Sequence, residues 1–533
     1  MAIDCNRKLS EPSEKRLTES QSASLAIGVA LLIVIATVSY MGFRTHRSFF
    51  HDDAYITLRY AQHWQAGIGP VWNQDERVEG YTSFLHLALL SLIQPSEDSP
   101  EPSARLISLI AYGGIWIFLL IYSWRRHRTR HLRLSQLLIL LSTLATSFPI
   151  VAWTLGGLET TLYTLLVMCS IYLFADYSIR LNASRIFIVG LIFALAMMTR
   201  PEAAIFVVVS VLTCLLVTKS PKTTLLLILS VAVFYVPYFL WRWNYYGELL
   251  PNTYHAKLGT PMIKRLQDGF YYLHTYARSA PWLTLLAIAC WLHTLIMQKS
   301  HRTTAWKYMT AICITGSLYI VWTGGDHMPA YRFWAPMTPL FAWLVAHPFM
   351  QDKNPNHRRP LWIMPTVLIV VSVFQFTSVD QSIVNARRPD PAGAVGKQVG
   401  RYLEANFPKG SLVATNSAGA VAFFAPSLRF IDMLGLNDKQ IARRSEFPWL
   451  THWQQFPGHA KGDGEYVLGR QPDVIILGPA EGTIADSANQ SKTDLVWFLS
   501  DQELAQNQQF HQQYELQTVR INDTVLLTYY QRK

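Results

Sequence analysis

Long runs of apolar residues dominate the first 378 positions of the chain, and short charged segments separate them. Several runs have no charged residue over sixteen or more positions. That length approaches what a helix needs to cross a hydrocarbon core of about 30 Å. The pattern predicts 11 membrane-spanning helices, at residues 24–43, 106–124, 134–152, 161–177, 186–199, 203–218, 223–241, 282–298, 306–322, 333–349 and 361–378.

Two further stretches in the first large loop are less regular. Residues 81–93 are apolar but short for a span, and residues 53–64 mix apolar and polar positions. Both patterns are typical of helices that lie in the membrane–water interface. We therefore expect two interfacial helices between the first and second spans.

From residue 379 onward the pattern changes to that of a soluble α/β domain. Residues 396–405 have the spacing of a helix, and residues 514–530 predict a terminal hairpin with its turn at 521–523. Short apolar runs predict strands at 411–414, 429–433 and 473–477. At about 150 residues, this segment is long enough to form its own core.

Charge then orients the predicted helices. The net charge is +11, and only 15% of the residues are charged. Residues 1–378 contain 31 Lys and Arg against 19 Asp and Glu, whereas the remainder contains 15 against 16. The basic excess lies in short loops, which stay cytoplasmic, so it indicates topology and not nucleic-acid binding.

This topology divides the chain into three parts. We expect a cytoplasmic tail over 1–23, a transmembrane domain over 24–378 and an extracytoplasmic α/β domain over 379–533. The protein would be a multi-pass protein of the bacterial cytoplasmic (inner) membrane. The five cysteines, none of them in the last part, give no basis for a disulfide framework or a Cys-based zinc site.

The loops that this topology places outside contain most of the unusual polar residues, whereas the middles of the helices are almost uncharged. An ion-coupled transporter would usually have ionisable groups at mid-membrane. A site at the outer boundary suits a lipid whose polar head leaves the bilayer. There a carboxylate can deprotonate an attacking hydroxyl, and cations can stabilise a departing phosphate.

Several of these outer segments carry recognisable motifs. They are DDAYITLRYA at 52–61, VWN at 71–73, VEGYT at 78–82, TRPE at 199–202, PNTYHAK at 251–257, GGD at 324–326 with Arg332, and GHAKGD at 458–463. Together they resemble the membrane glycosyltransferases of the C superfamily, and among them the mycobacterial terminal arabinofuranosyltransferase group.

The resemblance implies a polyprenyl-phosphate sugar donor, an inverting mechanism and an outer-leaflet site. It assigns the general base to Asp52 or Asp53, with Asp52 slightly favoured. A divalent cation bridging Asp53 and the phosphate stays open, although no spacing of ligands indicates one. The sugar would be arabinofuranose, and the acceptor a cell-envelope glycan, a lipid-linked glycan or a pilin.

Other polar residues of the motifs are candidates for binding. For the donor phosphate and sugar they are Lys257, Arg332, Arg200, Glu79, Glu202, Asn252, Tyr254, Asp326 and His327. For the acceptor, or for a lid, they are His459 and Lys461. Three alternatives stay open: a transporter or flippase of lipid-linked sugars, a mannosyltransferase of the same fold, and a non-catalytic scaffold.

Overall fold

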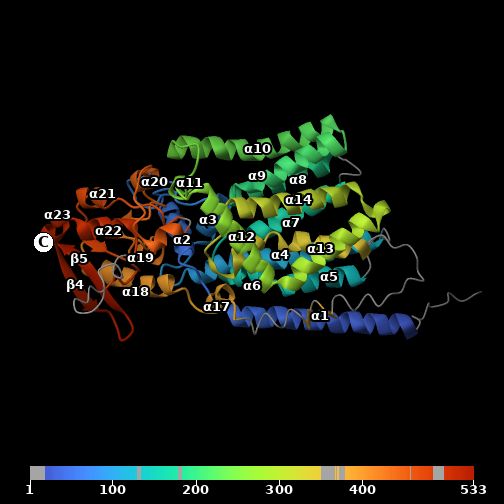
Figure 1. Cartoon of the computed structure of the whole chain (residues 1–533), viewed down its shortest axis with the longest axis horizontal. Helices are drawn as coiled ribbons and strands as arrows, with labels where there is room; N and C mark the ends of the chain where they lie inside the picture. Colours follow the sequence, from blue (N-terminus) through green and yellow to red (C-terminus); the bar gives the residue numbers. More distant parts are fainter. Residues whose placement is uncertain are drawn as a thin grey trace, which may run out of the picture.

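A bundle of long helices and an α/β region lie end to end in the computed structural model (Figure 1). The structure describes residues 19–128, 134–177, 183–349, 379–456, 458–483 and 497–533, with 366–367 and 369–370. Residues 1–18 of the predicted tail and most of the span predicted at 361–378 lie outside these residues, while residues 19–23 of that tail belong to the first helix. The α/β region occupies one end of the molecule, so the bundle has one covered end.

The apolar runs form the helices of the bundle. These are α1 (Glu19–His46), α4 (Glu101–Arg128), α5 (Leu134–Ala145), α6 (Phe148–Leu155), α7 (Thr160–Tyr177), α8 (Ala183–Thr199), α9 (Ala203–Leu212), α10 (Pro221–Tyr246), α13 (Pro281–Ile296), α14 (Thr304–Trp322) and α15 (Thr338–Ala346). Each lies within a few residues of a predicted span. The span predicted at 134–152 is bent by 51° between α5 and α6, where Pro149 enters the first turn of α6.

Within the described residues, three helices are long and apolar enough to cross a membrane: those containing 26–46, 101–125 and 221–246. The number rises to five if each of two bent helix pairs counts as one span. Several apolar helices of 10–17 residues complete the bundle. The protein is therefore a membrane protein by its helices, while the count of 11 spans and their orientation stay predictions.

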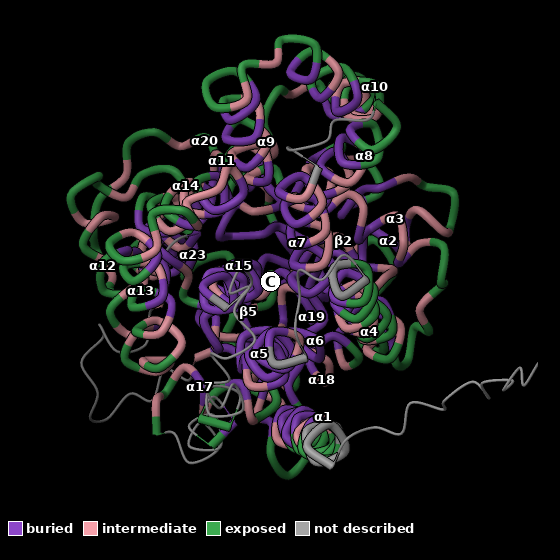
Figure 2. The backbone as a smooth tube through the Cα atoms, turned by 90° about the vertical axis from the view of Figure 1, so that its right-hand side faces the viewer, coloured by how far each residue is buried: buried purple, intermediate pink, exposed green. Residues whose placement is uncertain are grey.

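Burial follows the same division. Seen along the bundle, buried residues lie at its centre, while α1 and α10 expose much of their outer surface (Figure 2). Only 28% of the apolar window of each of these two helices is buried inside the protein. Exposed apolar side chains are what a lipid-facing surface requires.

Four further helices lie at the covered end of the bundle. They are α2 (Asp53–Gln65), α3 (Phe84–Ile93), α11 (Asn252–Ala256) and α12 (Met262–Ser279). The first two are the expected helices of the first loop. The sequence analysis did not predict α12, an amphipathic helix that meets α13 at 97°.

The α/β region contains one sheet of five strands in the order β2-β1-β3-β5-β4. The strands are β1 (Leu412–Thr415), β2 (Arg429–Asp432), β3 (Val474–Ile476), β4 (Tyr514–Arg520) and β5 (Leu526–Arg532). The first three are parallel, and β5 is antiparallel to β3 and to β4. The predicted strands and hairpin are confirmed to within two residues.

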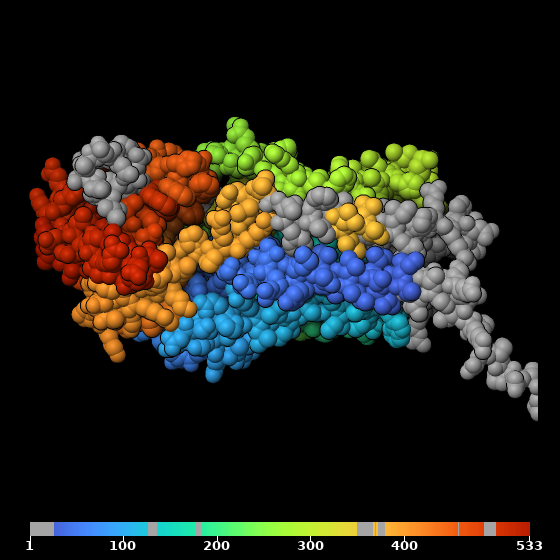
Figure 3. All heavy atoms as spheres, turned by 90° about the horizontal axis from the view of Figure 1, so that it is seen from below, coloured from blue at the N-terminus to red at the C-terminus, as the bar shows by residue number. Residues whose placement is uncertain are grey.

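Helices connect and cover these strands. They are α17 (Gln381–Asn385), α18 (Pro391–Asn406), α19 (Ala420–Phe423), α20 (Lys439–Arg443), α21 (Gly464–Gly469), α22 (Leu499–Gln506) and α23 (Gln508–Gln513). The predicted helix at 396–405 is the central part of α18. Residues of α17 and α18 follow the surface from the side of α1 toward the sheet (Figure 3).

The helical part and the α/β region are joined by buried hydrogen bonds from α2 and the loop after it. The Arg59 guanidinium, 1% exposed, donates to the carbonyl of Ala422 and, at 3.0 Å, to that of Leu428. The Asn73 amide donates to the Phe430 carbonyl at 2.8 Å and accepts from its N–H at 3.1 Å. The motif around Arg59 therefore holds the two parts together.

Candidate active site

The two adjacent carboxylates at the start of α2 point into different surroundings. Asp52 is buried, 8% exposed, and its Oδ1 accepts a hydrogen bond of 2.8 Å from the N–H of Ala420. Its own N–H donates to Oδ2 of Asp390 at 2.7 Å. Burial, and next the negative charge of Asp390, raise the pKa of Asp52 to about 7. Asp52 is thus part of the contact between α2 and the α/β region.

Asp53 remains accessible, with 37% of its side chain exposed. Its N–H donates to Nδ1 of His51 at 3.2 Å, and the same nitrogen lies 3.8 Å from Oδ1 of Asp53. An imidazole that accepts at Nδ1 carries its proton on Nε2 when neutral. Asp53 is near enough to Lys257 and His327 for its negative charge to oppose the lowering of the pKa of both groups by burial.

Two arginines on the same side of the bundle are held by carboxylates. Nε of Arg332 donates to Oδ2 of Asp326 at 2.8 Å. Arg200 donates to Glu159 at 2.6 Å and also to Glu202. The Arg332 cation lowers the pKa of Asp326, and Arg200 and Arg332 lower that of Glu159, both against the effect of burial. All three carboxylates therefore serve to fix cations.

Lys257 differs from these arginines. It follows α11, and no described carboxylate forms an ion pair with its ammonium group. Burial by the surrounding protein atoms lowers the pKa of the Lys257 ammonium group, and the Arg332 and Arg200 cations lower it further. The carboxylates of Asp326 and Asp53 partly oppose this shift. The side chain is nevertheless accessible to solvent. Lys257 thus offers a positive charge that no described carboxylate pairs with, near enough to Arg332, Arg200 and Asp53 to interact with them electrostatically.

A strained turn presents Arg332. The two preceding residues, Ala330 (φ 55°, ψ 30°) and Tyr331 (φ 50°, ψ 52°), both have left-handed backbone conformations and are buried. Such conformations cost about 1–2 kcal/mol for residues other than glycine and recur at functional sites. The Tyr331 hydroxyl donates to Oδ2 of Asp380 at 2.9 Å, and Ser279 donates to the same oxygen at 2.7 Å. These bonds stabilise the turn.

Two histidines connect the loop after α14 with the α/β region. The rings of His327 and His459 meet edge to face, with centroids 5.1 Å apart. Burial, and then His459, lower the pKa of His327 to about 4, so that its imidazole is neutral near pH 7. Nδ1 of His327 lies 3.8 Å from Asp326. We call Asp53, Lys257, Arg200, Arg332 and Asp326 the charged cluster. The predicted lid residue His459 thus lies at its edge, beside His327.

Four predicted binding residues serve other contacts. Glu79 forms a buried bidentate pair with Arg242, with N–O distances of 2.6 and 2.9 Å. The Asn252 amide donates to three carbonyls of the α/β region, among them Gly435 at 2.9 Å. Lys461 is buried and donates to the Ala442 carbonyl, whereas Tyr254 lies on the surface.

The structure also adds residues that the sequence analysis left out of its site. His51 contacts Asp53, Glu159 holds Arg200, and Asp380 holds the turn before Arg332. His51 could have been predicted from the sequence, because it lies two residues before Asp53. Glu159 and Asp380 could not be found this way, because their partners lie 41 and 49 residues away in the chain.

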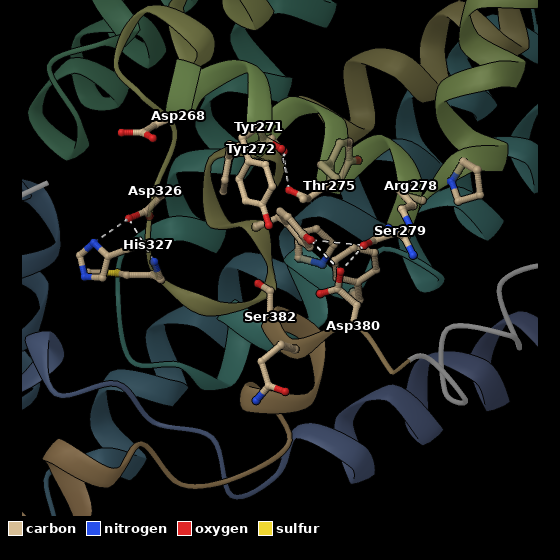
Figure 4. A pocket seen from close by; sticks show the side chains of 18 of the residues that line it. Asp268, Tyr271, Tyr272, Thr275, Arg278, Ser279, Asp326, His327, Asp380 and Ser382 are labelled. Atoms are coloured by element: carbon tan, nitrogen blue, oxygen red, sulfur yellow. Dashed lines mark hydrogen bonds and ion pairs between the residues drawn. The ribbon is translucent and has the colours of Figure 1, made fainter. Parts of the chain in front are cut away.

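A cavity of about 980 Å³ reaches the cluster. Figure 4 shows part of its wall, with Tyr271, Tyr272 and Thr275 on α12 and with Asp326 and His327 at one end. Ser279, Asp380 and Ser382 lie toward the other end. The cavity therefore connects the charged cluster with the side of the molecule where α12 meets α13.

The arrangement of the acidic, histidine and cysteine side chains bears on whether a divalent cation binds at this site. In the described part of the chain, no three His, Cys, Asp or Glu side chains are grouped so that they could hold a metal ion. Asp53 and Asp326 each have a nitrogen partner within 3.8 Å.

Comparisons with known proteins found similar sequences and structures. A family model described as a domain of unknown function (DUF8728) matches residues 384–530. The terminal β-(1→2)-arabinofuranosyltransferase of Mycobacterium tuberculosis is 25% identical over 349 residues, which are 59% of this chain and 54% of that protein. The chain thus spans about half the length of the curated relative that it matches.

Two solved structures are also similar. ArnT from Cupriavidus metallidurans bound to undecaprenyl phosphate gives a TM-score of 0.48 at 11% identity, over 75% of this chain and 85% of that one. The same protein in the apo state gives 0.48 at 12%, over 77% and 86%. The sequence match confirms the predicted resemblance of this chain to the terminal arabinofuranosyltransferase group of C-superfamily membrane glycosyltransferases.

Proposed function

We propose that this protein is an inverting glycosyltransferase that moves an arabinofuranosyl group from a polyprenyl-phosphate donor to a glycan acceptor. The observation that carries the proposal is the exposed ammonium of Lys257, which no described carboxylate pairs with. It is near enough to Arg332, Arg200 and Asp53 to interact with their charges. An accessible cation without an anionic partner is suited to an anionic ligand. The arabinofuranosyl specificity is taken from the name of the mycobacterial relative.

The phosphate of the donor would bind the cations. Arg332 and Arg200 are held in place by Asp326, Glu159 and Glu202, so that little side-chain entropy is lost when phosphate binds. Lys257 adds the charge that no carboxylate balances. As the bond between the anomeric carbon and the phosphate oxygen breaks, the phosphate keeps the electron pair, and these cations stabilise it.

Asp53 is the proposed general base. Its carboxylate takes the proton of an acceptor hydroxyl while the oxygen of that hydroxyl attacks the anomeric carbon from the face opposite the phosphate. The proton ends on Asp53, and the sugar is joined to the acceptor with inverted configuration. His51, which accepts from the N–H of Asp53 and packs against Trp153, positions the start of α2.

Asp52 has a structural role in this proposal. Its Oδ1 is already engaged by Ala420, and its raised pKa leaves it partly protonated near neutrality. Gly419 packs directly against this carboxylate, because a Cβ added at position 419 would lie 2.5 Å from Oδ2 of Asp52. No space is left there for an acceptor hydroxyl.

Sugar transfer by purified protein in lipid nanodiscs tests the function. Labelled polyprenyl-phosphoryl arabinofuranose is the donor and a cell-envelope extract the acceptor, with a polyprenyl-phosphoryl mannose donor in parallel. Wild type should transfer arabinofuranose, and Asp53→Asn should lose 10²–10⁴-fold in rate, the usual contribution of a general base. Asp98→Asn, whose side chain is 93% exposed, is the matched control and should keep the rate.

Three results would contradict parts of the proposal. Full transfer by Asp53→Asn would remove the assigned base. Transfer from the mannose donor alone would contradict arabinofuranose as the transferred sugar. The assignment as a glycosyltransferase would stand. No transfer from either donor by well-folded wild type would remove the enzymatic function.

A further inference from the structure

The side chains around the 980 Å³ cavity have a distinctive composition. Aromatic rings contribute much of the wall, and hydroxyl groups are interspersed among them. The aromatic residues are Phe148, Tyr271, Tyr272, Tyr276, Trp282, Tyr331 and Phe456. Long aliphatic side chains are few, with Leu283 and Met328 among them. A site for acyl or prenyl chains would be expected to be mainly aliphatic.

Two of these rings have faces that are free to contact a ligand. Tyr271 is 70% exposed and Trp282 is 50% exposed, and they come from α12 and α13 on the two sides of the 97° bend. Rigid aromatic rings provide large contact areas at low cost in conformational entropy. The C–H faces of a sugar ring pack well on such surfaces, while hydroxyl groups of the wall can bond its polar edge.

Charge in the cavity is nearly balanced. Its formal cations are Lys264 and Arg278, and Lys264 is paired with Asp268 at 2.8 Å. Asp326 and Asp380 add negative charge. The three cations proposed to bind phosphate do not line this cavity. An anionic ligand would therefore gain little here, whereas a neutral one would avoid the cost of burying charge.

The cavity also ends at the right place for a reaction. Asp326 and His327 form part of its wall, and Asp326 belongs to the charged cluster as well (Figure 4). A ligand that fills the cavity would thus bring one end close to Arg332, Lys257 and Asp53. A cavity of 300–1,000 Å³ is of the size that binds a small molecule or a short chain of sugars.

We propose that this cavity binds the non-reducing end of a neutral glycan, which is the acceptor. The inference rests on the proposed function and narrows it, because it selects an uncharged saccharide over a phosphorylated lipid headgroup or a protein side chain. Tyr271 and Trp282 contact the sugar rings, and the terminal hydroxyl lies at the Asp326 end.

Binding can be measured without donor or transfer. We would record saturation-transfer difference NMR on the full chain in nanodiscs. The probes are trisaccharides of arabinofuranose, mannose and glucose, and a glucosamine disaccharide bisphosphate. At least one neutral trisaccharide should bind more tightly than the bisphosphate. Tyr271→Ala should weaken that binding about tenfold, as expected for one lost stacking contact.

Phe270→Ala is the matched control. Phe270 neighbours Tyr271 on α12, is 61% exposed and does not line the cavity, so its loss should leave binding unchanged. Tighter binding of the bisphosphate, no binding of any neutral trisaccharide, or equal binding by Tyr271→Ala would overturn the inference. Binding through Tyr271 without any sugar transfer would instead contradict the proposed function and leave the glycan site in place.

Discussion

Replacing Asp52 with asparagine should make the stability of the protein less sensitive to a rise in pH. In the folded protein, burial and the charge of Asp390 raise the pKa of Asp52 to about 7, compared with 3.8 for a solvated carboxyl group. A raised pKa means that the folded state binds the proton more tightly than the unfolded state does. The stabilisation is complete below pH 3.8 and is lost as the pH rises through about 7.

The size of the effect follows from the difference in pKa. About three units correspond to roughly 4 kcal/mol over the whole range, at 1.36 kcal/mol per unit. Between pH 5 and pH 7 the free energy of unfolding of the wild type should fall by about 2 kcal/mol through this group alone. Asparagine stays neutral, and its side-chain oxygen can still accept from Ala420.

Thermal unfolding in nanodiscs at pH 5, 6, 7 and 8 measures the difference. For 533 residues the entropy of unfolding is about 1.1 kcal/mol/K, so 2 kcal/mol corresponds to roughly 2 °C. The Tm of Asp52→Asn relative to wild type should therefore rise by about this amount from pH 5 to pH 7, and then level off. Asp98→Asn, at an exposed position, should show a constant difference.

A Tm difference that does not change with pH would refute the reasoning. It would mean that Asp52 is ionised across the whole range and that its burial is compensated by groups other than those described.

Four further changes test other parts of the structure. Lys257→Met should raise the KM for donor and lower kcat/KM ten- to a hundredfold, the value of one charge-assisted bond, and an unchanged KM would remove its phosphate role. Glu79→Gln should cost about 3–5 kcal/mol in thermal or denaturant unfolding by leaving Arg242 unpaired, and adding Arg242→Met should restore most of it. Arg59→Met should increase proteolytic release of the α/β region, and resistance equal to wild type would contradict the role of Arg59 as a link. Tyr331→Phe should raise the KM for donor without lowering Tm by more than about 1–2 °C, because the turn before Arg332 loses its bond to Asp380; an unchanged KM would make that bond incidental.

The sequence was informative where one physical requirement dominated. Buried strands such as β3 need continuous apolar runs, and spanning helices need long ones, so both could be predicted to within a few residues. The amphipathic α12 was missed because Lys264, Arg265 and Asp268 interrupt its apolar positions. Its pattern is recognisable as helical, but nothing local indicates that it turns by 97° into α13.

The site was less predictable than the fold. Asp52 and Asp53 are neighbours in the same loop, and only contact with a segment more than 330 residues away distinguishes the buried carboxylate from the accessible one. The same holds for Asn252 and Lys461, whose polar groups bond carbonyls of the α/β region. Polar residues in a shared loop can bind substrate or bind the protein itself, and sequence spacing does not separate these uses.

The contact of Asp52 with Ala420 also has a consequence for the order in which the protein matures. Residues 51–332 supply the whole charged cluster, and a ribosome completes them before it reaches the α/β region. The hydrogen bonds that Asp52, Arg59 and Asn252 form with the α/β region therefore cannot form until that region has been synthesised and folded. The joint between the bundle and the α/β region is thus assembled last, after the bundle has supplied the residues of the charged cluster.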